Sequence, residues 1–301
     1  MRFLAAYILR GRMQAVTAVS VPAVLSLLFP PLSLLSSGGV ALITLRKGWS
    51  DGGFTVLISA LVIAVLGGLL FGGSLFTVGY GLVLWVPVWL LAILLRETGR
   101  IGSAIEAAVL LGVLSVPATY AIVPDPAALW QSRVDQIIKP LIEQATPDVD
   151  AAPLMERISR ISHYLTGIMV CGTLVSVLLG LYLGRWWQAI TFNPGGFGKE
   201  FLVLRPHGWI VSVGVLMIVT AVLSGGRFSE MVWNMILPMF VLFTMVGVAV
   251  LHTVIAHSKA KRVLLLLLYF TMLFIPHVLL LIAGVGLTDT WIDWRAKVSL
   301  G

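Results

Sequence analysis

Long apolar stretches separated by short, mostly basic connections run through almost the whole of this chain. Of its 301 residues, 59% are apolar and only 11% are charged, whereas soluble domains contain about 25% charged residues. One water-soluble core could not enclose so much apolar surface, so we expect lipid to surround the chain. Because lipid offers no partners to backbone N–H and C=O groups, these stretches predict an all-α, polytopic transmembrane helix bundle.

Nine apolar stretches approach the roughly 20 residues that a helix needs to cross the membrane. Pro30 and Pro31 separate the first two, which are predicted either as two tilted spans or as a re-entrant hairpin. We expect about 8 to 9 spans in one integral membrane domain, residues 1–301. The stretches are Met13–Phe29, Leu32–Leu45, Phe54–Phe71, Leu75–Leu95, Ile101–Val123, Tyr164–Leu183, Trp209–Leu223, Met231–Ile255 and Val263–Leu287.

The basic residues predict the orientation, because Lys and Arg accumulate in cytoplasmic connections. Thirteen of the 20 basic residues fall on alternate connections, which favours a cytoplasmic N-terminus and an extracytoplasmic C-terminus. We therefore attribute the net charge of +7 to these orientation signals, and we expect no nucleic-acid partner. The thirteen are Arg2, Arg10, Arg12, Arg46, Lys47, Arg96, Arg100, Arg185, Lys199, Arg205, Lys259, Lys261 and Arg262.

One long segment, residues 124–162, is predicted to lie on the extracytoplasmic side. Its apolar side chains recur at helical spacing and predict an amphipathic helix. That helix either rests on the bilayer surface or caps an outward-facing pocket. The apolar stripe consists of Trp130, Val134, Ile137, Ile138, Leu141 and Ile142.

Clustered glycines mark the polar interruption RWWQAITFNPGGFGKEFLVLR, Arg185 to Arg205. A phosphate-binding P-loop requires Ser or Thr after its Gly-Lys pair, and Glu200 stands there instead. Asn193, Pro194 and Gly195 are turn formers. Residues 184–208 therefore predict a cytoplasmic glycine-rich connector, and Gly195, Gly196, Phe197 and Lys199 are candidate docking residues for a partner.

Three stretches resemble the YybS-like family of uncharacterised bacterial polytopic membrane proteins, which is distantly similar to the S components of energy-coupling factor transporters. They are PAVLSLLFPPLSLLSSGGVALITLRKG (Pro22 to Gly48), LLRE (Leu94 to Glu97), and LGRWWQA with PGGFGKEF (Leu183 to Phe201). The resemblance implies a bacterial inner-membrane protein with a small-solute pocket that opens outward. S components often carry an Ala-x-x-x-Ala motif on their first helix. This chain departs from it, because Ala15 is followed four positions later by Val19.

Small residues on the second stretch form a face on which helices can approach closely. Ser33, Ser37 and Ala41 are therefore candidate docking residues for an energising partner, or they simply pack neighbouring helices together.

Two ionisable residues lie inside apolar stretches, where such groups indicate function. Glu106 either faces headgroups or serves as a buried carboxylate, and His277 is either bonded to a carbonyl freed by Pro276 or a pocket ligand. The predicted topology places a candidate pocket in the outer half of the spans, lined by Tyr120, His163, Tyr164, Trp233, Asn234 and His277.

No catalytic motif such as H-E-x-x-H or G-x-S-x-G occurs, and Cys171 is the only cysteine. We therefore expect no enzyme activity, no cofactor and no metal site. The leading hypothesis is a subunit that binds a small solute and depends on a separate energising partner for uptake. The alternative is a non-transporting scaffold or regulator that docks a cytoplasmic partner, which a solid interior without an outward cavity would favour.

Overall fold

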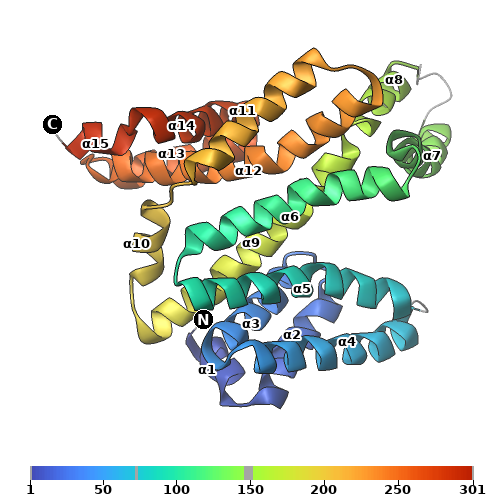
Figure 1. Cartoon of the computed structure of the whole chain (residues 1–301). Coiled ribbons are helices and arrows are strands. Elements are labelled where there is room, and N and C mark those ends of the chain that lie inside the picture. The colour runs from blue at the N-terminus through green and yellow to red at the C-terminus, as the bar shows by residue number, and fades with distance from the viewer. Residues whose placement is uncertain (1, 72–73, 146–151, 300–301) are drawn as a thin grey trace.

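Helices account for all the regular structure in the described part of the chain. The computed structural model describes residues 2–71, 74–145 and 152–299, and these contain fifteen helices and no strand (Figure 1). The all-α prediction is confirmed. The helices are α1 (Arg2–Arg10), α2 (Arg12–Leu25), α3 (Leu32–Lys47), α4 (Trp49–Phe71), α5 (Ser74–Thr98), α6 (Ile101–Ile122), α7 (Pro126–Ala145), α8 (Ala152–Ser162), α9 (Leu165–Phe192), α10 (Gly196–Leu202), α11 (Gly208–Leu223), α12 (Gly226–Ala256), α13 (Lys261–Phe274), α14 (Val278–Ile292) and α15 (Trp294–Ser299).

Five helices in the described residues are long and apolar enough to cross a membrane, fewer than the 8 to 9 expected. They are α4, α5, α6, α9 and α12, and a sixth is reached only if α13 and α14 count as one bent span. The other apolar helices are too short: α2, α3 and α11 have 14, 16 and 16 residues. At 1.5 Å per residue they reach about 21 to 24 Å, whereas the hydrocarbon layer is about 30 Å thick.

The first two stretches form a short helical hairpin rather than two long spans. α2 packs against α3, and Ser36 Oγ donates to the Val19 carbonyl oxygen at 2.7 Å. Arg12 at the start of α2 pairs with Asp51 at the start of α4, Nε to Oδ1 2.6 Å. The chain thus returns after α3 to the end at which α2 began.

The ninth stretch is broken near Pro276, where the axes of α13 and α14 are bent by 118°, either as a broken span or as a re-entrant loop. After this bend, Arg295 donates to the carbonyl oxygens of Leu202 and Leu204, at 2.7 and 2.6 Å. The C-terminal helix α15 lies beside the connector that precedes α11. The side of the membrane on which each chain end lies stays a prediction.

Small residues let two helix pairs come into backbone contact. Gly180 and Gly184 of α9 face Ser37 and Ala41 of α3, and a Cβ at Gly180 would lie 2.5 Å from the Ser37 Cβ. The face predicted to dock a partner consists of Ser33, Ser37 and Ala41. All three residues are buried within the chain. α12 and α14 make a similar contact further along the chain.

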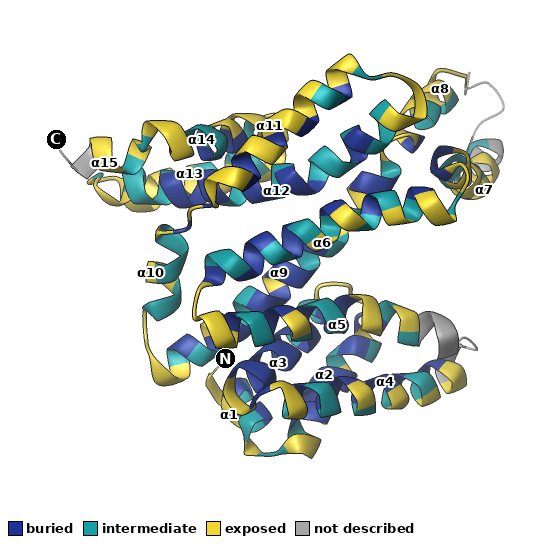
Figure 2. Cartoon of the chain, viewed as in Figure 1, coloured by how far each residue is buried: buried dark blue, intermediate teal, exposed yellow. Residues whose placement is uncertain are grey.

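Apolar side chains cover much of the outer surface. Figure 2 shows exposed residues along α4 and α11, while most of α3 is buried. Leu61, Leu216 and Leu266 are examples, with exposed fractions of 56%, 62% and 73%. Such a surface suits a hydrocarbon solvent, and the long apolar helices are consistent with a multi-pass membrane protein.

Candidate functional site

A cavity of about 630 Å³, open to the outer surface, lies between α5, α6 and α9, and its lining residues Val83, Leu111 and Met169 are about half exposed. Small-molecule sites generally occupy 300–1,000 Å³ and are lined mainly by apolar side chains. None of the lining residues is charged. They are Leu82, Val83, Val86, Pro87, Leu91, Ala108, Leu111, Gly112, Ser115, Thr119, Trp130, Thr166, Met169, Val170, Thr173, Leu174 and Val177.

Polar groups line this cavity where the C-terminal half of α6 meets the start of α9. Trp130, from α7, donates its indole N–H to the Thr166 hydroxyl at 2.9 Å. Ser115 and Thr119 donate their own hydroxyl protons to carbonyl oxygens of α6, at 2.7 and 2.9 Å. Because each hydroxyl oxygen retains a free lone pair, this end of the cavity can accept hydrogen bonds from a ligand.

Three of the six predicted pocket residues meet beside this polar end, around Glu230 of α12. Tyr120 Oη donates to Glu230 Oε1 at 2.5 Å, and His163 Nδ1 lies 2.6 Å from Glu230 Oε2. Asn234, which is completely buried, donates to the His163 carbonyl oxygen at 2.7 Å. Its Oδ1 accepts the N–H of Gly167 at 2.6 Å. These bonds tie the ends of α6, α9 and α12 together.

The other three predicted pocket residues do not join this network. Tyr164 is 44% exposed, and Trp233 packs against the apolar core. His277 is exposed at the bend between α13 and α14. None of the six lines the apolar cavity; Thr119, the neighbour of Tyr120, does.

Glu106 has a partner within the chain. Its side chain is buried, and Oε1 accepts the backbone N–H of His207 at 2.7 Å. The His207 ring contacts the same carboxylate, Nδ1 to Oε2 2.6 Å. His207 is the N-cap of α11, so Glu106 holds the start of that helix against α6.

The predicted amphipathic segment forms α7 and α8, while residues 146–151 lie outside the described residues. Trp130 reaches the cavity, as expected for a cap. Ile137 and Leu141 further along α7 are 64% and 57% exposed, as expected for a helix on a bilayer surface. Each alternative thus fits a different part of α7.

The glycine-rich connector contains the short helix α10, and Gly195 before it has a φ of 85°. The rings of Phe197 and Phe201 lie 5.7 and 6.2 Å from that of Tyr182 in α9. The connector therefore packs an apolar edge against α9. Lys199 is exposed, and its role in docking stays a prediction.

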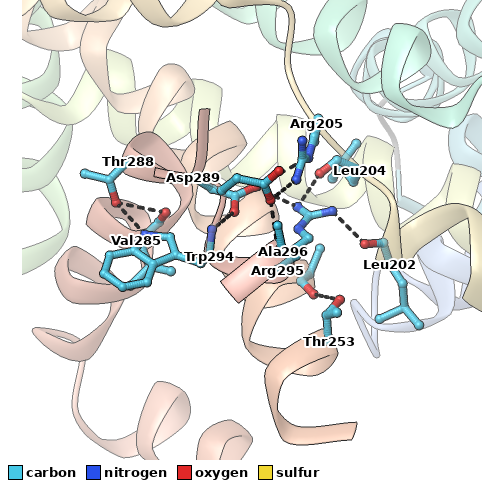
Figure 3. A network of polar contacts seen from close by, with 12 residues as sticks. Leu202, Leu204, Arg205, Thr253, Val285, Thr288, Asp289, Trp294, Arg295 and Ala296 are labelled. Atoms are coloured by element: carbon cyan, nitrogen blue, oxygen red, sulfur yellow. Dashed lines mark hydrogen bonds and ion pairs between the residues drawn. The ribbon is translucent and has the colours of Figure 1, made fainter. Parts of the chain in front are cut away.

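A second polar network, not predicted from the sequence, joins the C-terminal segment to this connector (Figure 3). Asp289 is 1% exposed, and its Oδ2 lies 3.3 Å from Arg295 Nη2 and 3.8 Å from Arg205 Nε. Arg205 also donates to Asp293, which lowers the pKa of that exposed carboxyl below its ordinary value. Trp294 donates its backbone N–H to Asp289 Oδ1 at 3.1 Å.

Comparison with protein-family models, with curated proteins and with solved structures finds no match to this chain. Among the described residues, no three His, Cys, Asp or Glu side chains are grouped so that they could hold a metal ion.

Proposed function

We propose that this chain is a bacterial inner-membrane protein that binds a small, mainly apolar solute in the cavity between α5, α6 and α9. In this proposal it resembles S components, and a separate partner provides the energy for uptake. The observation that carries the proposal is the cavity itself, about 630 Å³ in volume. A scaffold that works only through its surfaces has no need of such a cavity.

The lining of the cavity indicates the class of solute. Burying a charge among uncharged, mostly apolar side chains is strongly unfavourable, so phosphorylated and multiply charged compounds are poor candidates. The oxygens of Ser115, Thr119 and Thr166 can accept hydrogen bonds at one end of the cavity. An apolar molecule that carries one hydroxyl or amide donor fits both features.

We further propose that both ends of the chain lie in the cytoplasm. Arg295 binds the connector between α10 and α11, and Arg12 lies beside the start of α4. Basic connections thus gather at one end of the bundle, as expected for the cytoplasmic side. The polar end of the cavity then faces outward, and Trp130 covers it from the extracytoplasmic helix α7.

Reporter fusions test this orientation. An enzymatic tag that is active only in the cytoplasm should be active at both the N-terminus and the C-terminus. Activity at the N-terminus alone would place Arg295 outside and contradict the proposed topology.

Filling the cavity should strongly reduce solute binding. Thr173 lines the cavity, whereas a Cβ at the neighbouring Gly172 meets no atom within 4 Å. Thr173→Trp should therefore displace the solute, and Gly172→Trp is the matched control on the same helix. We expect native mass spectrometry of the detergent-extracted protein to show a small molecule on the wild type and on Gly172→Trp, with roughly tenfold lower occupancy on Thr173→Trp.

Equal occupancy in both variants would contradict a site in this cavity. If phospholipid is the only molecule bound to the wild type, the scaffold alternative is favoured. Copurification of a nucleotide-hydrolysing module with the wild type would support the energising partner.

A further inference from the structure

A second and smaller cavity, of about 120 Å³, lies at the basic end of the bundle. It forms where the C-terminal ends of α3 and α9 meet the glycine-rich connector. No residue of the solute cavity contributes to it, so its role is independent of solute binding. Its lining residues are Arg46, Arg185, Gln188, Ala189, Phe192, Asn193, Gly196, Phe197 and Glu200.

Arg46 is the cation of this cavity that lacks an acidic partner among the described residues. Its guanidinium carbon lies 3.6 Å from the centroid of the Phe192 ring. Stacking on an aromatic ring fixes the plane of a guanidinium group and leaves its N–H edge available for a planar, bidentate contact with an anion. Arg46 also lies in the last turn of α3, where a helix favours cations.

The single carboxylate in the cavity is already neutralised. Arg185 binds both carboxylate oxygens of Glu200, one of them at 3.0 Å from Nε. Its Nη1 donates to the Gln188 side-chain oxygen. The side chains of Arg185 and Glu200 are only 22% and 27% exposed, so this arrangement is held in place by packing. One positive charge, that of Arg46, therefore remains in excess.

Two amide groups add neutral donors. The Gln188 oxygen is occupied by Arg185, which leaves its NH₂ group available. The side-chain amide of Asn193 makes no hydrogen bond within the described residues. Arg46, Gln188 and Asn193 line a space of about 120 Å³, which holds roughly four waters at about 30 Å³ each. That space suits one tetrahedral oxyanion and is too small for a nucleotide.

We propose that this cavity binds a phosphate group through Arg46 and the amide nitrogens of Gln188 and Asn193. The GGFGK segment, which lacks the features of a P-loop, contributes one wall of the site rather than a loop around the phosphate. The phosphate can belong to an anionic phospholipid or be free in the cytoplasm. Phe192, which lines the cavity, is 50% exposed, as suits an aromatic side chain at a membrane interface.

Two binding assays separate these sources. Purified protein in detergent is titrated with inorganic phosphate by calorimetry, and delipidated protein is titrated with phosphatidylglycerol by native mass spectrometry. Arg46→Ala should weaken binding roughly 10- to 100-fold, because it removes a charge-assisted hydrogen bond. Lys47→Ala is the matched control, since it removes one exposed basic charge from the adjacent position, which does not line the cavity.

The site is supported if either probe binds the wild type, if Arg46→Ala weakens that binding at least tenfold, and if Lys47→Ala preserves it. The probe that binds identifies the source. The proposal is overturned if neither probe binds, or if the two variants weaken binding equally. Should Arg46→Ala fail to fold, Arg46→Lys keeps the charge but loses the stacked, forked geometry. That variant should still bind more weakly than Lys47→Ala, and equal binding would overturn the proposal.

Discussion

Gly286→Leu is expected to keep α14 from docking on α12 and to reduce the yield of folded protein sharply. A Cβ at Gly286 would overlap the carbonyl oxygen of Phe243, and one at Gly247 would overlap that of Ile282. These neighbours are backbone atoms, so no side-chain rotation can relieve the overlap. The helices must separate, at a cost of about 3 kcal/mol or more. Thermal unfolding in detergent, compared with the wild type, measures this loss.

Gly284→Leu is the matched control for this substitution, two residues away on the same helix. A Cβ at Gly284 meets no atom within 4 Å, and the residue is exposed. This variant should unfold within a few degrees of the wild type. If the two variants unfold at the same temperature, α12 and α14 do not pack through their glycines.

Asp289→Ala should have a comparably large effect, because it leaves Arg295 buried without its carboxylate. The Asp289 side chain is 1% exposed and that of Arg295 only 10%. Burial lowers the pKa of Arg295, yet an arginine stays charged at neutral pH. Removal of one partner from a buried ion pair costs about 3–5 kcal/mol. We expect a lower unfolding temperature and faster proteolysis at the C-terminal segment.

Asp293→Ala provides the comparison, since Asp293 binds Arg205 at the surface, where their side chains are 43% and 48% exposed. Exposed ion pairs contribute little to stability, so this variant should remain close to the wild type. The double variant Asp289→Ala, Arg295→Met should regain part of the lost stability, because it removes both buried charges. Equal effects of Asp289→Ala and Asp293→Ala would contradict a buried pair.

The helical class follows from composition, but the number of spans does not. Apolar length is similar in a continuous helix and in a broken one, so the stretch Val263–Leu287 reads as one span in the sequence, although the structure breaks and bends it near Pro276. The proline was visible in the sequence. Its effect was not, because prolines such as Pro117 and Pro238 lie within continuous helices. Tertiary contacts decide whether a proline kinks a helix or ends it.

The sequence predicts site residues only where topology groups them. Tyr120, His163 and Asn234 were expected in one region, and the structure brings them together. Glu230, whose carboxylate contacts Tyr120 and His163, is not singled out by the sequence, because it lies just outside the apolar stretch that begins at Met231. Its position one helical turn before Asn234 is the sequence signal that could have identified it as part of this site.

The apolar cavity and the Asp289 network could not be inferred from the sequence. The cavity is lined by residues such as Val86, Ala108 and Val170, which look like any membrane-helix residues. The partners of Asp289 include Arg205, which is 84 positions away in the chain. Only the folded arrangement of α5, α6 and α9, and of α14 with the connector, produces these sites.

Photo-crosslinking in intact membranes tests the central claim, that a small solute occupies the cavity, most directly. A photoreactive amino acid placed at position 173 should yield one adduct of defined, non-lipid mass, and the same probe at position 172, on the open side of α9, should not. Phospholipid adducts alone at both positions would show that the cavity holds only lipid and would contradict the account.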